Sequence, residues 1–245
     1  MPTYTQKHPK QLTNGNCVGI LDANWLVPYV PGDTTNASTY DFPVLYKMVT
    51  GVDLKLVLAG DPGQAGPIIE AVQELAREGA RCITGDCGFL IHYQQQAADA
   101  VDVPVFMSSL LQLPVIESLL GDKRSIAILC ADRASVDNTV LEKAGSTGNR
   151  KIVVDDLANC PEFSGNLLQS SDSIDTDKVE TEVVSICRTL QANNPGLGAF
   201  LFECSMLPPY SHAVQAATRL PVFDFVTMIN LFQNVTHRSA YSGYF

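Results

Sequence analysis

The chain has 245 residues, of which 46% are hydrophobic and 17% are charged, and it contains no long polar run. This composition supplies a substantial core for one large domain or two smaller ones, and it excludes wholesale disorder. The net charge is −10, from 26 acidic and 16 basic residues. Because the Lys and Arg are scattered along the chain, the charge argues against nucleic acid as a partner.

The N-terminal sixteen residues are polar and lack an apolar core, so we interpret them as a loosely packed lead-in and not as a secretory signal. No apolar run reaches the roughly 18–20 residues that a membrane span requires. The seven cysteines are an odd number without a paired C-x-x-C spacing, which predicts free thiols in a reducing compartment and no zinc site. These features predict a cytoplasmic protein with neither a metal centre nor a membrane partner.

Apolar runs separated by turn residues predict alternating strands and helices. Residues 17–22 read as a first buried strand, and a long loop rich in Pro, Gly, Asn and Thr follows it. A loop at the carboxyl end of a parallel strand suits substrate contacts, and a plain surface excursion is the equally weighted alternative. Further strands are expected at 55–59, 81–85 and 103–107, and helices at 64–78 and 89–100.

The alternation continues through the rest of the chain, where only the polar stretch 158–175 predicts no regular element. Strands are expected at 125–130, 151–154 and 198–203, and helices at 110–120, 135–144, 175–191, 208–220 and 226–235. Such alternation requires parallel sheets with right-handed crossovers. We expect the last helix to pack back on the first half, so the predicted domains are 1–112 plus 222–245 and an inserted 113–221.

Two strand ends repeat one pattern at positions 117 residues apart. The segment ITGDC ends at Cys87 and the segment FLFEC ends at Cys204, and in both cases Pro-Val-Phe begins 17 residues after the cysteine. An internal repeat of this kind predicts two similar α/β halves, each presenting one thiol at the carboxyl edge of its sheet. The other cysteines are expected to be structural: Cys17, Cys82, Cys130, Cys160 and Cys187.

Two thiols on opposite sides of a carbon atom suit proton transfer at that carbon. A cysteine before a helix lies near the positive end of the macrodipole, which predicts a lowered pKa and a usable thiolate. One thiolate can remove a proton and the other thiol can return one to the opposite face. Helix N–H groups and the hydroxyls of Thr84 and Ser205 are the expected donors to the developing charge. Strand alternation predicts that Asp86 and Glu203 point away from the site.

Three segments together resemble the aspartate/glutamate/hydantoin racemase superfamily across nearly the whole chain. They are ILDANWLVPYVPGDTTNASTYDFPVLY, ITGDCGFL and FECSMLPPYSHAVQAATRLPVFDF. The resemblance implies two pseudo-symmetric parallel-sheet α/β domains, an active site in the cleft between them, no cofactor, and catalytic cysteines at Cys87 and Cys204. Asp22 resembles the acidic residue that assists a catalytic cysteine in glutamate racemases.

The chain also departs from glutamate racemases beside both cysteines. Those enzymes have Asn-Thr after the first and Thr-His after the second, whereas this chain has Gly88-Phe89 and Ser205-Met206. The replacements predict a more apolar pocket and argue against glutamate as the substrate. The expected substrate-binding residues are Asp22, Thr84, Gly88, Phe89, Ser205 and Met206.

The main functional prediction is a cofactor-independent racemase or isomerase that acts at the α-carbon of a small amino acid or related carboxylate. A lyase of the same superfamily is the first alternative, since algal dimethylsulfoniopropionate lyases resemble relatives of this kind and begin with the same proton removal. Arylmalonate decarboxylases keep one of the two cysteines and fit less well. A non-catalytic small-ligand-binding protein is the second alternative, and a homo-oligomer is compatible with the resemblance.

Overall fold

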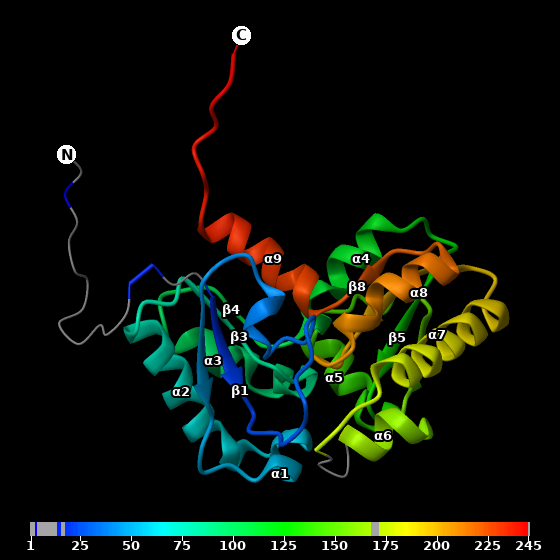
Figure 1. Cartoon of the computed structure of the whole chain (residues 1–245), viewed down its shortest axis with the longest axis horizontal. Coiled ribbons are helices and arrows are strands. Elements are labelled where there is room, and N and C mark those ends of the chain that lie inside the picture. The colour runs from blue at the N-terminus through cyan, green and yellow to red at the C-terminus, as the bar shows by residue number, and fades with distance from the viewer. Residues whose placement is uncertain (1–2, 4–13, 16–17, 168–171, 245) are drawn as a thin grey trace.

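The computed structural model describes residues 3, 14–15, 18–167 and 172–244 of the chain. Most of the predicted N-terminal lead-in, Cys17 and part of the polar stretch 158–175 lie outside these residues. The described strands form two four-stranded sheets, and Figure 1 shows the two α/β halves that contain them side by side. The predicted architecture of two parallel-sheet α/β units is therefore confirmed.

The two sheets have equivalent strand orders, and all their strand pairs are parallel. The first sheet has the order β2-β1-β3-β4, with β1 at Val18–Asp22, β2 at Val44–Met48, β3 at Cys82–Thr84 and β4 at Val105–Phe106. The second has the order β6-β5-β7-β8, with β5 at Ser125–Cys130, β6 at Ile152–Asp156, β7 at Leu197–Phe202 and β8 at Val222–Phe223.

The internal repeat extends to the backbone hydrogen bonds of the strands that lead to the two cysteines. The Ile83 N–H donates to the Pro104 carbonyl at 3.0 Å, and the Phe200 N–H donates to the Pro221 carbonyl at 2.9 Å. Both partners of the second bond lie 117 residues after those of the first. The duplication inferred from the sequence is therefore a duplication of strand register.

Helices occupy most of the connections between the strands. The α-helices are α1 Leu54–Leu58, α2 Ala65–Arg77, α3 Gln94–Asp99, α4 Leu113–Leu119, α5 Asn138–Lys143, α6 Pro161–Leu167, α7 Thr176–Asn193, α8 Ser211–Thr218 and α9 Phe225–Thr236. Short 3-10 helices are η1 Ala37–Thr39, η2 Pro62–Gln64, η3 Gly88–Tyr93, η4 Ser109–Gln112, η5 Arg133–Ser135 and η6 Pro208–Tyr210. The chain after each cysteine therefore enters a 3-10 turn before its α-helix.

One predicted strand is wrong. Residues 55–58 fall in helix α1 and residue 59 is its C-cap. The Asp53 carboxylate caps the start of this helix by accepting hydrogen bonds from the N–H groups of Lys55 at 2.9 Å and Leu56 at 3.3 Å. Strand β1 pairs with β3 on one side and with β2 on the other. No strand was predicted over the residues of β2. Helix α6 also lies within the stretch 158–175, where no element was expected.

The last helix packs on the first half, as predicted. In α9, Phe225, Met228 and Ile229 are fully buried in one cluster with Val18 and Ile20 of β1. The two-residue strand β8 pairs with β7 in the second sheet, although the predicted domain division places residues 222–245 with the first half. We therefore propose that the chain returns to the first half after β8.

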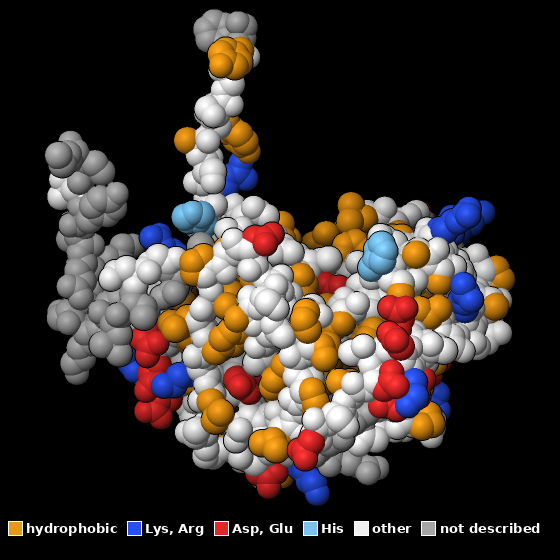
Figure 2. All heavy atoms as spheres, viewed as in Figure 1, with side chains coloured by type: hydrophobic (Ala, Val, Ile, Leu, Met, Phe, Trp, Pro, Cys, Tyr) orange, Lys and Arg blue, Asp and Glu red, His pale blue; other side chains and the backbone are white. Residues whose placement is uncertain are grey.

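The face of the molecule shown in Figure 2 has no continuous basic patch. On the side of the molecule shown in Figure 2, the Lys and Arg side chains lie near the rim and form no continuous stripe. Among the residues that the structure describes, no helix has both the length and the apolar character needed to cross a membrane.

Candidate active site

The carboxyl ends of the central strands of both sheets open onto one cavity of about 180 Å³. Its walls come from the segments that follow β1, β3, β5 and β7, together with α1. The sixteen lining residues are Ala23, Trp25, Tyr29, Leu54, Leu58, Asp86, Cys87, Gly88, Phe89, Ala131, Asp132, Ser135, Glu203, Cys204, Ser205 and Met206. This is the carboxyl edge where parallel α/β sheets bind ligands.

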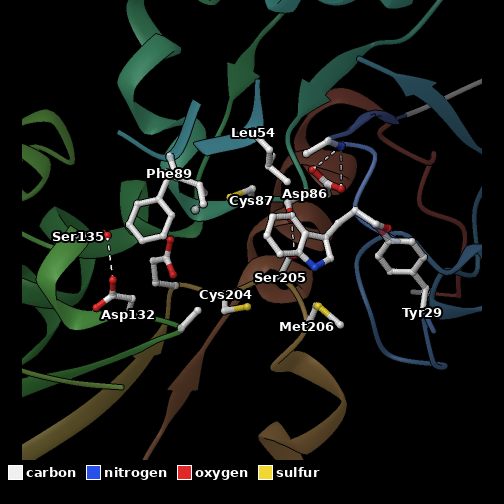
Figure 3. A pocket seen from close by; sticks show the side chains of 16 residues that line it. Tyr29, Leu54, Asp86, Cys87, Phe89, Asp132, Ser135, Cys204, Ser205 and Met206 are labelled. Carbon is white, nitrogen blue, oxygen red and sulfur yellow. Dashed lines mark hydrogen bonds between the residues drawn. The ribbon is translucent and has the colours of Figure 1, made fainter. Parts of the chain in front are cut away.

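Cys87 and Cys204 both line this cavity, one from each half of the molecule. Figure 3 shows the two side chains on facing sides of the pocket. Each thiol accepts a hydrogen bond from the backbone N–H two residues further on, which belongs to Phe89 in the first loop and Met206 in the second. The predicted convergence of the two thiols on one site is confirmed, and their catalytic roles remain a prediction.

The predicted lowering of the thiol pKa values is wrong. Burial raises the pKa of Cys87 and of Cys204 well above the usual value, and the Glu203 carboxyl raises both further. The N–H hydrogen bonds act in the opposite direction with a smaller effect. The cysteines precede short 3-10 turns in an acidic, buried setting, so both thiols are protonated at neutral pH.

Four of the six predicted substrate-binding residues line the cavity: Gly88, Phe89, Ser205 and Met206. The Ser205 hydroxyl is already engaged, because it donates a short hydrogen bond to the Asp86 carbonyl of the opposite loop. This bond joins the two cysteine loops directly. Ser205 therefore fixes the site's geometry, and its hydroxyl is not free to donate to a substrate in this arrangement.

The structure does not bring the other two predicted substrate-binding residues, Thr84 and Asp22, to the cavity wall. Thr84 is fully buried, and its hydroxyl donates to the Phe106 carbonyl of the neighbouring strand at 2.8 Å. Asp22 accepts a hydrogen bond from the Asn24 N–H at 2.7 Å and is not among the sixteen lining residues. Its charge still reaches the site, since it contributes to the raised pKa of Tyr29.

Asp86 and Glu203 line the cavity, so the prediction that they point away is wrong. Strands β3 and β7 end at Thr84 and Phe202, and beyond these points strand alternation no longer governs side-chain direction. Burial raises the pKa of each carboxyl to about 8. Asp86 accepts the Ala23 N–H at 3.0 Å through both oxygens, whereas Glu203 Oε1 is buried without a hydrogen-bond partner among the described residues.

The loop after β1 supplies the aromatic wall. Tyr29 and the single tryptophan of the chain, Trp25, line the cavity, and the Tyr29 hydroxyl donates to the Trp25 carbonyl at 2.7 Å. Burial raises the pKa of Tyr29, and the carboxyls of Asp86, Asp22 and Asp33 raise it further. The substrate-contact interpretation of this loop therefore fits better than the surface-excursion alternative.

The cavity has carboxyl groups, aromatic rings and thiols but no basic side chain among its sixteen lining residues. In the part of the chain that the structure describes, no three His, Cys, Asp or Glu side chains are grouped so as to hold a metal ion. What the arrangement offers is proton transfer by two thiols, next to carboxyls that titrate near neutral pH.

No family model matches the chain. A dimethylsulfoniopropionate lyase from Durusdinium sp. clade D is 31% identical over 88% of this chain and 73% of its own length. Dimethylsulfoniopropionate lyase 3 from Emiliania huxleyi is 32% identical over 87% of this chain and 58% of its own length. The chain thus spans less than two thirds of the second protein.

Solved structures share the fold at low sequence identity. Unliganded arylmalonate decarboxylase superposes with a TM-score of 0.58 at 13% identity, covering 92% of this chain and 94% of that one. A glutamate racemase from Bacillus anthracis superposes with a TM-score of 0.59 at 15% identity, covering 92% and 84%. The chain therefore has the two-domain fold of the aspartate/glutamate racemase superfamily and belongs to the family of the dimethylsulfoniopropionate lyases.

Proposed function

We propose that the protein is a lyase that cleaves dimethylsulfoniopropionate or a closely similar onium carboxylate. The observation that carries this proposal is the convergence of Cys87 and Cys204 on one cavity, in a chain whose curated relatives are named dimethylsulfoniopropionate lyases. The lyase alternative thereby takes precedence over the racemase that the sequence favoured.

The reaction follows from proton removal next to a carboxylate. A cysteine thiolate takes the proton from the α-carbon, and the electron pair of the C–H bond forms the carbon–carbon double bond. The bond between the β-carbon and sulfur breaks, and its electron pair leaves with sulfur. The products are dimethyl sulfide and acrylate, and one proton is released when the thiol returns to its thiolate form.

The charge of the cavity supports a substrate with a positive leaving group. Asp86 lines the cavity beside Tyr29 and Trp25, and no Lys, Arg or His lines it. Aromatic faces attract a sulfonium ion, and a cation beside Asp86 favours the ionised form of that carboxyl, whose pKa burial raises to about 8. A dicarboxylate such as aspartate would instead bring a second negative charge into an acidic site without a cation to receive it. This difference favours the lyase over an aspartate or glutamate racemase.

Racemisation at the α-carbon of a small carboxylate is the second candidate. Two thiols on facing sides of a cavity are what inversion requires, whereas elimination requires one base. The same first step serves both reactions, so the fate of the substrate distinguishes them.

The test is an assay of the purified full chain with dimethylsulfoniopropionate in deuterated water. We expect dimethyl sulfide, measured by gas chromatography, and acrylate, measured by NMR, in equal amounts. A racemase would instead incorporate deuterium at the α-carbon of chiral amino acids with loss of optical rotation and no unsaturated product. Ligand binding without exchange or turnover would overturn both proposals and identify a binding protein.

A further inference from the structure

Glu203 comes from the second half of the molecule and contacts the first. It follows β7 directly, and its N–H donates to the Leu129 carbonyl of β5 at 2.9 Å, which fixes the backbone at the strand end. Its side chain is 1% exposed and reaches the loop of Cys87, where a methyl group on Gly88 would overlap the carboxyl. The carboxyl therefore occupies the wall between the two thiols' loops.

One oxygen of this carboxyl is buried and unpaired in the part of the chain that the structure describes. Oε1 has no hydrogen-bond partner among the described residues, and leaving such a buried group unpaired is destabilising. The titratable groups that it influences are the thiols of Cys87, Cys130 and Cys204, whose pKa values it raises. An unpaired polar atom of this kind at a cavity wall is suited to meet a ligand.

The other acids of the cavity are occupied or lie elsewhere. Both oxygens of Asp86 accept the Ala23 N–H, and its charge acts on Tyr29 at the aromatic wall. Asp132 accepts the Ala134 N–H at 3.0 Å. The carboxyls that act most strongly on the pKa of Tyr29 are those of Asp86, Asp22 and Asp33. One part of the cavity is thus lined by aromatic rings and the Asp86 carboxyl, and in another part Glu203 adjoins the loops that carry the thiols.

A substrate carboxylate in this cavity requires hydrogen-bond donors, and the lining offers no basic side chain. Burial alone raises the pKa of Glu203 to about 8, so at neutral pH the group is mainly a neutral carboxylic acid with an O–H to donate. A carboxylic acid kept neutral by its surroundings can hold an oxyanion and stabilise it further as charge develops.

We propose that protonated Glu203 donates a hydrogen bond to the carboxylate of the substrate, holding it between Cys87 and Cys204. The bond strengthens as the α-proton leaves, because negative charge then moves onto the carboxylate oxygens. The inference rests on the proposed function only in requiring a ligand with a carboxylate. Glu203 is then a catalytic residue, whose neutral form is the active one.

The test uses Glu203→Gln and Glu203→Leu in the full chain. Glutamine keeps a donor of the same size and does not titrate, whereas leucine keeps the bulk and removes the donor. The probe is propionate, a carboxylate without a leaving group, whose dissociation constant is measured by NMR titration at pH 7 and pH 9. Glu117→Gln is the matched control, since Glu117 is a buried glutamate whose carboxyl is bonded to Ser146 and Thr147 away from the cavity.

We expect wild type and the control to bind propionate about tenfold more weakly at pH 9 than at pH 7, because the range spans the titration of Glu203. The glutamine variant should lose the part of this pH dependence that Glu203 causes and keep only the smaller part from Asp86, which also lines the cavity and titrates near pH 8. The leucine variant should bind weakly at both values. An unchanged pH dependence in Glu203→Gln, or wild-type affinity in Glu203→Leu, would overturn the inference. Because propionate is not turned over, a failure of the lyase assay leaves this result interpretable.

Discussion

The surroundings of Cys87 and Cys204 make both thiols weak acids. Burial raises their pKa values, and the nearby Glu203 carboxyl adds to the effect, so neither thiol is a base at neutral pH. A bound sulfonium ion acts in the opposite direction, because a neighbouring positive charge stabilises a thiolate. An onium substrate therefore contributes to the formation of the base that attacks it.

Removal of either cavity thiol should abolish turnover. We expect Cys87→Ser and Cys204→Ser each to lose dimethyl sulfide production by at least about 100-fold, because a serine hydroxyl is a far weaker acid and a poor general base. Cys160→Ala is the control, at a buried thiol that does not line the cavity. Full activity in either cavity variant would exclude the paired role.

The repeated cysteine pattern was sufficient to predict that the two thiols converge, because each follows the equivalent strand of its own sheet and both strand ends open onto one cavity. The directions of Asp86 and Glu203 were not predictable by strand alternation, since both follow the last strand residue. Their pKa values depend on burial by loops distant in the sequence. No local pattern contains that information.

At the scale of elements, the two cysteine loops and the loop after β1 are bonded to one another. The Ser205 hydroxyl donates to the Asp86 carbonyl, and the Thr34 hydroxyl donates to the Ser205 carbonyl at 3.1 Å. These bonds connect segments from both halves. The positions of the thiols relative to each other therefore depend on Ser205.

Loss of this connection should affect both stability and catalysis. We expect Ser205→Ala to lower the free energy of unfolding by about 1–2 kcal/mol, because the buried Asp86 carbonyl loses its donor. Turnover should fall while the thiols remain present, since their spacing becomes less restricted. Urea denaturation and steady-state kinetics measure the two effects. Ser118→Ala is the control, at an exposed hydroxyl bonded within α4, and an equal loss there would contradict the argument.

Two of the misassigned elements, β2 and α1, follow one another in the first half of the molecule. Strand β2 is partly exposed along its whole length. Its residues do not alternate between apolar and polar in the way that predicts a strand. The apolar residues of the run 55–59 belong to a helix and not to a buried strand. Val57 is buried in the core, while Leu54 and Leu58 line the cavity. Strongly buried strands such as β5 were predictable because the whole run is apolar.

At the scale of the whole molecule, the chain is negatively charged, whereas the buried acids of the site are mainly neutral at neutral pH. The net charge is −10, and three buried acids near the cavity have raised pKa values, namely Asp33, Asp86 and Glu203. A negative protein attracts a cationic group and repels free dicarboxylates. The overall charge and the cavity therefore favour the same class of ligand.

The same three carboxyls link stability to pH. Burial raises the pKa of Asp33 to about 7 and those of Asp86 and Glu203 to about 8 in the folded chain. In the unfolded chain they titrate near 4. Their contribution to stability is therefore full below about pH 4 and is lost as the pH rises through the folded values.

We expect the free energy of unfolding to fall by at least about 2 kcal/mol between pH 5 and pH 9, since one pKa unit corresponds to about 1.4 kcal/mol. Urea denaturation at several pH values measures this slope. Glu203→Gln should have a shallower slope and be more stable than wild type at pH 9, because its side chain never acquires a buried charge. Glu117→Gln should be less stable than wild type at every pH from 5 to 9 and have the same slope. Although burial acts to raise the pKa of Glu117, hydrogen bonds from Thr147 and Ser146 outweigh it and lower that pKa, so its contribution to stability is complete above about pH 4. A stability that stays flat or rises toward pH 9 would contradict the assignment of neutral carboxyls to the cavity.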